Sequence, residues 1–227
     1  MVASRYEIEI KTLLGGKEKA DALLTKMQAS DPETKLIGEG SQLNHYFVVG
    51  DRARIIELVS EQLSSEKRDL LKKMLEEGKN ISLRTREAKA KVLLVVKASI
   101  DDTTSSNGTA RLEFEEALPG MTLAALDQLL LAAGCTYQAK WSRDRKEYAF
   151  RDSVVCIDRN AGYGYLAEFE KILEDQGQAE QAKGELRALM AELGVVELPQ
   201  DRLERMFAFY NEHWPEYYGT DKIFDIQ

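Results

Sequence analysis

The stretch Glu7-Ile8-Glu9-Ile10-Lys11 alternates charged and aliphatic side chains without interruption. In a β-strand, side chains at i, i+2 and i+4 lie on the same face. Glu7, Glu9 and Lys11 are therefore predicted to share one face of a strand, and the two isoleucines the other. The same spacing of two recurs in doublets of like charge further along the chain: Arg84 and Arg86, Glu113 and Glu115 after Arg111, Arg143 and Arg145, and Glu168 and Glu170.

An antiparallel sheet with one solvated face is the simplest interpretation of any one of these strands. Same-face neighbours of like charge repel each other, however, so a solvated sheet gains no stability from the doublets. A site that binds cations with carboxylates and phosphates with basic side chains does gain from them. A purely structural core lined with unpaired charges would be costly. The doublets therefore predict a β-barrel with a charged, ligand-binding interior.

The rest of the chain mixes strand and helix patterns. Strands are predicted over residues 5–13, 42–49, 81–87, 91–99, 111–116, 136–150, 153–159 and 164–172. Helical periodicity covers residues 17–28, 54–77, 122–133, a stretch from about residue 179, and 201–213. The step Ser64-Ser65 is expected to split the longest helical stretch, and Gly78 to end it. Antiparallel strands with interspersed helices indicate an α+β fold.

The composition limits the chemistry that the chain can perform. The 227 residues carry a net charge of −8, which argues against a general nucleic-acid-binding protein, so no nucleic acid partner is expected. Two cysteines and two histidines exclude a disulfide framework and disfavour a zinc site, so any metal would be a hard cation on oxygen ligands. The longest apolar run, Val92 to Val96, is far short of a membrane span, and no signal-peptide pattern is found. We therefore expect a soluble cytoplasmic protein with no membrane partner.

The charged positions divide into a metal set and a phosphate set. Mg²⁺ and Mn²⁺ prefer oxygen ligands and commonly bridge carboxylates to phosphate oxygens. The predicted metal ligands are Glu7, Glu9, Glu168 and Glu170, supported by Asp158, Glu113 and Glu115. Phosphates suit guanidinium forks and lysine ammonium groups. The predicted phosphate ligands are Lys11, Arg84, Arg86, Lys97, Arg143 and Arg145, and Arg111 either joins them or holds Glu113 or Glu115 in place.

The order of these motifs resembles that of the CYTH superfamily, the triphosphate tunnel metalloenzymes. The resemblance spans residues 7–170 and includes Glu7-Ile8-Glu9-Ile10-Lys11 for E-x-E-x-K, Arg84-Thr85-Arg86 followed by Lys97, Glu113-Phe114-Glu115, Arg143-Asp144-Arg145-Lys146-Glu147-Tyr148, and residues 158–170 for D-x-x-x-G-x-G-x-x-x-E-x-E. It implies a closed eight-stranded antiparallel barrel, or tunnel, over residues 1–175, with flanking helices and a C-terminal helical segment, residues 176–227, packed on it. It also implies a divalent metal and a reaction at a triphosphate.

Two features depart from the family pattern. The family carries Y-F-D-T after its second strand, whereas here Tyr46-Phe47 is followed by Val48-Val49-Gly50. The helical stretch over residues 54–77 is longer than the usual connection, and we expect it to pack on the strands rather than to form a lid or an oligomer contact. The aromatic residues of the tail are expected to cover the barrel, with a homodimer contact as the alternative.

Several reactions fit the predicted site. The leading hypothesis is a metal-dependent triphosphatase acting on inorganic triphosphate or an organic triphosphate such as ATP. A second metal, or Lys97 if its pKa is lowered, is the candidate for aligning the attacking water. A class IV adenylyl cyclase uses the same kind of site to convert ATP to cyclic AMP and pyrophosphate. Thiamine triphosphatase is a third hypothesis, favoured if Trp141 stacks on the thiamine. A module that binds polyphosphate or nucleotide without catalysis is the non-enzymatic alternative.

Overall fold

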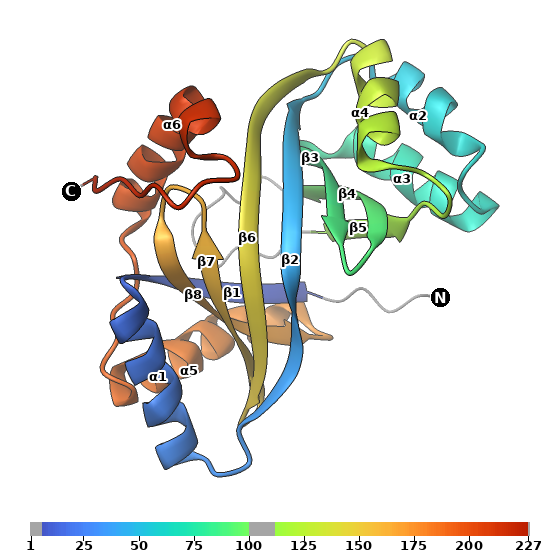
Figure 1. Cartoon of the computed structure of the whole chain (residues 1–227). Coiled ribbons are helices and arrows are strands. Elements are labelled where there is room, and N and C mark those ends of the chain that lie inside the picture. Colours follow the sequence, from blue (N-terminus) through green and yellow to red (C-terminus); the bar gives the residue numbers. More distant parts are fainter. Residues whose placement is uncertain (1–5, 100–111, 227) are drawn as a thin grey trace. The chain divides into compact units, whose positions relative to one another are not determined.

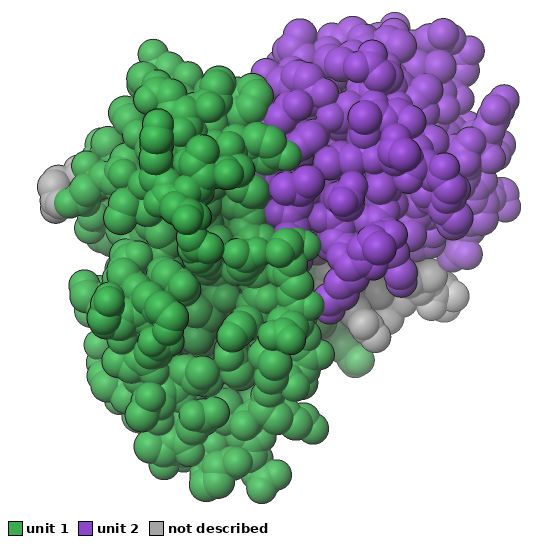
Figure 2. Space-filling model, viewed as in Figure 1, with its two compact units in different colours: residues 1–41, 104–110, 142–227 green, residues 42–103, 111–141 purple. Residues whose placement is uncertain are grey.

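The computed structural model describes residues 6–99 and 112–226 (Figure 1). The chain divides into two compact units (Figure 2). Unit 1 contains Met1–Ser41 and Ser142–Gln227, together with Thr104–Ala110, which lies outside the described residues; unit 2 contains Gln42–Thr103 and Arg111–Trp141. Two long strands, β2 (Lys35–Val48) and β6 (Thr136–Phe150), each begin in one unit and end in the other.

The eight strands form one sheet in the order β1-β8-β7-β6-β2-β3-β4-β5. The remaining strands are β1 (Tyr6–Gly15), β3 (Lys79–Ala88), β4 (Lys91–Ser99), β5 (Leu112–Ala117), β7 (Ser153–Asn160) and β8 (Gly164–Leu173). The predicted closed barrel is wrong, because this sheet is open. Closure requires its two edge strands to pair with each other, and within the described ranges β1 pairs with β8 and β5 with β4, but not with one another. Side-chain alternation predicts only which face of a strand a residue occupies. The alternation is the same in an open sheet as in a closed barrel, so it does not predict closure.

Six α-helices accompany the sheet in the described part of the chain, as an α+β fold requires. They are α1 (Lys17–Ser30), α2 (Arg52–Ser60), α3 (Ser65–Glu77), α4 (Leu123–Ala132), α5 (Ala179–Glu192) and α6 (Gln200–Tyr217). The long helical stretch is split as predicted, because the Ser64 hydroxyl accepts a hydrogen bond from the Lys67 backbone N–H and begins a new helix.

The core of unit 1 lies between its strands and the helices α1 and α5. Ile8, Ile10 and Phe169 are fully buried in it, and each such side chain contributes about 1.5–3 kcal/mol of burial free energy. The isoleucines of the first strand therefore face the core. Glu7, Glu9 and Lys11 lie on the opposite face of β1, as the alternation predicts.

Unit 2 has a separate core in which α2, α3 and α4 cover the strands β3, β4 and β5. Leu83 and Val96 of the strands and Leu71 and Leu126 of the helices are fully buried. The helical stretch over residues 54–77 thus packs on the strands, as expected from the sequence.

The last described residues cross the turn between β7 and β8. In this C-terminal strap, residues 218–226, the Phe224 N–H donates to the Gly162 carbonyl at 2.8 Å, and the Gly162 N–H donates to the Lys222 carbonyl at 3.1 Å. The Phe224 ring contacts four other aromatic rings, those of Tyr163, Phe209, Tyr210 and Tyr217. The tail aromatics therefore cover a strand turn, and the homodimer contact stays a prediction.

A buried carboxylate joins α4 to three strands of unit 2. Asp127 accepts hydrogen bonds from Thr85 Oγ1 at 2.6 Å and Tyr137 OH at 2.7 Å, and its other contact is His45 Nδ1 at 2.7 Å. Burial alone would raise the pKa of Asp127, but the hydrogen bonds from His45, Thr85 and Tyr137 outweigh burial and hold the pKa below its usual value.

We expect Asp127→Asn to lower the free energy of unfolding at pH 7 by about 1–3 kcal/mol, because the buried donors lose an ionised acceptor. A carboxyl group whose pKa is lower in the folded than in the unfolded protein stabilises the fold at pH values above its unfolded-state pKa. This stabilisation is lost as the pH falls through the pKa of the folded state. Urea unfolding measured at pH 7 and in steps from about pH 5 to about pH 3 should therefore show the deficit of the variant shrinking on acidification. The exposed Asp69→Asn on α3 is the control. A deficit independent of pH would contradict the prediction.

Gly162→Ala should destabilise the protein by about 1–3 kcal/mol. Gly162 has a φ of +79°, and a Cβ there would lie 2.8 Å from both Phe224 Cε1 and Tyr210 Cδ2. Gly184→Ala, within α5 and with no atom within 4 Å of the added carbon, is the matched control and should be neutral or stabilising. Equal urea midpoints for the two variants would show that the strap does not restrict this turn.

Candidate functional site

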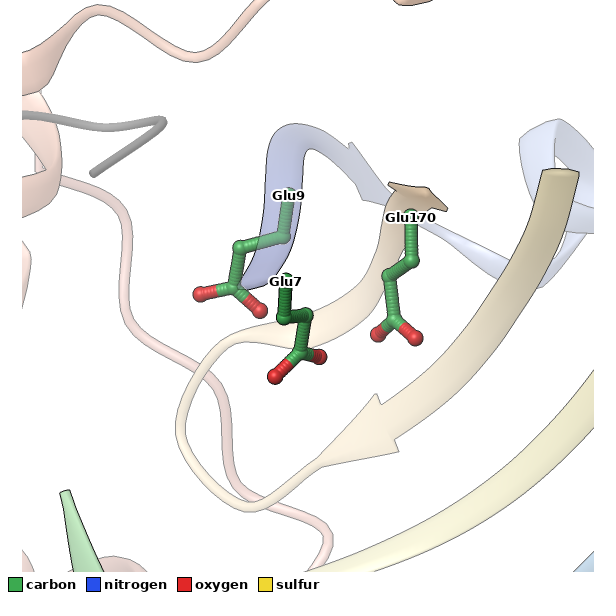
Figure 3. Close-up of side chains that lie close together, drawn as sticks. All are labelled: Glu7, Glu9 and Glu170. Atoms are coloured by element: carbon green, nitrogen blue, oxygen red, sulfur yellow. The ribbon is translucent and has the colours of Figure 1, made fainter. Parts of the chain in front are cut away.

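Three carboxylates converge on one face of the β1–β8 pair in unit 1. One carboxylate oxygen from each of Glu7, Glu9 and Glu170 lies within 4.8 Å of the others, and Figure 3 shows the three side chains extending to the same side. The strand register explains this arrangement, since Glu9 lies directly opposite Glu170 and Glu7 follows Glu9 on the same face. We refer to these residues as the carboxylate triad.

The triad concentrates negative charge in a partly buried place. The pKa of Glu170 is raised to about 8, first by burial and then by the charge of Glu168, with Glu7 and Glu9 adding to the rise and Arg145 opposing it. An oxygen-only donor set of this kind fits a hard divalent cation such as Mg²⁺ or Mn²⁺, which would relieve the repulsion among the carboxylates.

Two other carboxylates, Asp158 on β7 and Glu168 on β8, contact basic side chains. Asp158 is fully buried and accepts a bidentate pair from Arg145, with Nε at 2.8 Å from Oδ1 and Nη2 at 2.7 Å from Oδ2. Arg143 Nη1 donates to the same Oδ2 at 2.9 Å. Glu168 pairs with Arg145 Nη2 and lies 3.0 Å from Lys11 Nζ. Asp158 and Glu168 therefore hold three basic residues in place and lie outside the triad.

The charges of this cluster influence one another strongly. Burial alone would raise the pKa of Glu168, but Lys11, Arg145 and Arg143 outweigh burial and hold the pKa well below its usual range. Burial alone would lower the pKa of Lys11, but the carboxylates of Glu168 and Glu9 raise it above its usual value. Glu168 is thus held as an anion and Lys11 as a cation.

The charge balance of this group favours an added cation. Its five carboxylates are Glu7, Glu9, Asp158, Glu168 and Glu170, and its three basic side chains are Lys11, Arg143 and Arg145. With all groups ionised, the carboxylates exceed the basic residues by two charges, which is the charge of one divalent ion.

Unit 2 carries a second charged group, on β3, β4 and β5. Arg86 Nη1 donates to Glu115 Oε2 at 2.8 Å. Lys97 Nζ and Arg84 Nη2 lie 3.4 Å and 3.9 Å from Glu113 Oε1. Glu113 and Glu115, predicted as metal support, here pair with basic side chains. Arg111, the remaining predicted residue, lies outside the described residues.

Two uncharged residues of β2 belong to this second group, and the sequence patterns did not single them out for the site. Asn44 lies opposite Arg86 and Tyr46 opposite Arg84 in the β2–β3 register. Asn44 Oδ1 accepts from Arg86 Nε at 2.8 Å, and Tyr46 OH accepts from Arg84 Nη1 at 2.6 Å. Asn44 and Tyr46 are two residues apart, as are Arg84 and Arg86, and this equal spacing was the signal in the sequence. The signal can be used only when the register of β2 against β3 is known.

No family model matches the sequence, and no curated protein matches it either. Solved structures do share its fold. A conserved hypothetical protein from Pyrococcus furiosus aligns with a TM-score of 0.59 and 17% identity over 84% of this chain and 91% of its own. A protein from Vibrio parahaemolyticus named a "putative adenylate cyclase" aligns with a TM-score of 0.59 and 15% identity over 90% of this chain and 99% of its own. A "putative adenylate cyclase" from Bacillus halodurans gives a TM-score of 0.50 and 19% identity over 90% and 98% of the two chains.

These alignments extend over most of both chains and show that this chain shares its fold with the two proteins named putative adenylate cyclases. Among the described residues, no helix is both long enough and apolar enough to cross a membrane.

We expect Mn²⁺ or Mg²⁺ to raise the melting temperature of the wild-type protein. At about a hundredfold excess of metal over Kd, the free energy of unfolding should increase by about 2–3 kcal/mol. Glu170→Gln should abolish this increase, because it removes one triad ligand, and should leave the metal-free protein at least as stable, because it removes a repelling charge. Glu18→Gln, exposed on α1 of the same unit, should respond to metal like the wild type. A metal-dependent increase that survives in Glu170→Gln would place the cation elsewhere.

Proposed function

We propose that this protein is a divalent-metal-dependent triphosphatase that hydrolyses inorganic triphosphate or an organic triphosphate. The observation that carries the proposal is the carboxylate triad of unit 1, with its excess of negative charge, next to three basic residues that are already held in place. A triphosphate–metal complex needs both components within one group of side chains.

Each side chain of the unit 1 group has a role in the proposal. Glu7, Glu9 and Glu170 would hold Mg²⁺ or Mn²⁺, which when bound neutralises phosphate charge and orients phosphate oxygens. Lys11, Arg143 and Arg145 would bind phosphate oxygens and stabilise the negative charge on the departing group. Asp158 and Glu168 would keep these basic side chains in position, since they contact all three.

The second charged group fits the binding of an anion. Arg84, Arg86 and Lys97 together exceed Glu113 and Glu115 by one positive charge. We propose that this group binds phosphate oxygens. Lys97 stays a candidate for aligning the attacking water, and Lys97→Met, which removes its ammonium group, would test that role.

Adenylate cyclase is the second candidate function, and it is favoured by the names of two proteins that share the fold. In that reaction the ribose 3′-hydroxyl of ATP attacks the α-phosphate, the bond to the β-phosphate oxygen breaks, and pyrophosphate leaves. The same metal and phosphate ligands would serve both reactions, so only the product distinguishes them.

The purified protein should be assayed with Mg²⁺ or Mn²⁺ on inorganic triphosphate, ATP and thiamine triphosphate, with phosphate, pyrophosphate and cyclic AMP all measured. We expect phosphate release that requires metal and falls at least a hundredfold in Glu7→Gln, because a ligand charge is lost. The exposed Glu18→Gln is again the control.

Cyclic AMP as the main product from ATP would replace the triphosphatase by the cyclase. Tight binding of triphosphate without turnover of any substrate would identify a binding module. Full activity of Glu7→Gln would show that the triad is not the metal site.

A further inference from the structure

Two side chains of β2 accept hydrogen bonds from the two arginines of the second charged group. Asn44 and Tyr46 are two residues apart, so they share a face, and each lies directly opposite one arginine of β3. Each also accepts a hydrogen bond from that arginine, at 2.8 Å for Asn44 and Arg86 and at 2.6 Å for Tyr46 and Arg84. The two strands thus form two matched acceptor–guanidinium pairs.

The hydrogen bonds of Arg84 leave one edge of its guanidinium without a close partner among the described residues. Nη1 donates to the Tyr46 hydroxyl, and the guanidinium lies over the Tyr46 ring with its central carbon 5.3 Å from the ring centroid. Nη2 has only the long 3.9 Å ion pair with Glu113, and Nε is buried without a hydrogen-bond partner among the described residues. Nε and Nη2 form the side-on edge of the guanidinium, which matches two oxygens of one phosphate.

An anion can approach this edge at Nη2. The Glu113 side chain is 32% exposed and makes no close contact with Arg84, so a phosphate group can replace it next to Nη2. Arg86 differs, because its Nε is occupied by Asn44 and its Nη1 by Glu115. Arg84 is therefore the arginine of this pair whose bidentate edge is kept for a ligand.

We propose that Tyr46 is a positioning residue for Arg84, and Asn44 for Arg86, in the binding of the triphosphate. The inference rests on the proposed function and adds two uncharged residues to the second charged group. A free arginine side chain loses rotamer entropy when a ligand fixes it. The hydroxyl and the ring of Tyr46 fix the guanidinium of Arg84 beforehand, so less ordering remains when phosphate binds.

Tyr46→Phe tests this role, because it keeps the ring under Arg84 and removes only the hydroxyl. We expect it to weaken the binding of inorganic triphosphate in the presence of Mg²⁺, measured by isothermal titration calorimetry, by about five- to tenfold. The matched control is Tyr137→Phe, the same change in the same unit, which removes a hydroxyl bonded at 2.7 Å to Asp127. It should lower the urea midpoint and leave triphosphate affinity unchanged.

A double-mutant cycle separates positioning from general destabilisation. In an Arg84→Ala background, Tyr46→Phe should no longer change the affinity, because the side chain that it positions is gone. For the second pair, Asn44→Ala should weaken binding about fivefold, and Asn44→Gln, which offers the same acceptor group on a longer stem, should restore part of the loss.

The outcomes are distinct. A wild type that neither binds nor hydrolyses triphosphate overturns the proposed function, and the positioning role with it. Two results overturn the positioning role of Tyr46 and leave the proposed function standing, provided that the wild type binds triphosphate. In the first, Tyr46→Phe binds triphosphate as tightly as the wild type. In the second, Tyr46→Phe weakens binding by the same factor in the Arg84→Ala background as in the wild type.

Discussion

Glu9 and Glu170 lie directly opposite each other on paired strands, and the charged group of unit 1 depends on this pairing. Two like charges in that relation are destabilising on their own. The opposite face of the same strands compensates, since Ile8, Ile10 and Phe169 are buried in the core there and fix the register. A slip by one residue would expose these apolar side chains, so the fold keeps the carboxylates together in spite of their repulsion.

Acidic residues of the same kind play different parts according to their neighbours. Asp158 is fully buried, yet it holds two guanidinium groups, and Glu168 is held as an anion by the surrounding cations. Glu170, two residues after Glu168, has no ion pair as close as the two closest ion pairs of Glu168 among the described residues. Burial, and after it the charge of Glu168, raises the pKa of Glu170 to about 8. Asp158 and Glu168 organise the basic side chains, with Glu9 also pairing with Lys11 at 2.7 Å, and a cation could neutralise the charge that remains on the triad.

The sequence was most informative where side-chain alternation is a local property. Strands β4 and β6 have the bounds that the pattern predicts, and the charged and apolar faces of β1 are confirmed. The beginning of β2 was missed, because residues 35–41 contain two glycines and exposed Leu36 and Ile37, and therefore show no regular alternation. The barrel prediction failed because closure depends on the pairing of distant edge strands, which alternation does not encode. Asn44 and Tyr46 were missed as site residues because neither is charged and only the strand register reveals their partners.

The chain connectivity has a consequence for the order in which the protein forms during synthesis. Unit 2 is contained within residues 42–141, whereas the described part of unit 1 is built from segments on either side of it. Glu9 meets its partner Glu170 only after about 160 further residues have been made, and Phe224 reaches the β7–β8 turn later still. On the ribosome, unit 2 has all its strands and helices available while β1 is still without a partner. The first strand therefore has no strand partner until β8 has been made. Its alternating glutamates disfavour pairing of this strand with strands of other chains during that time.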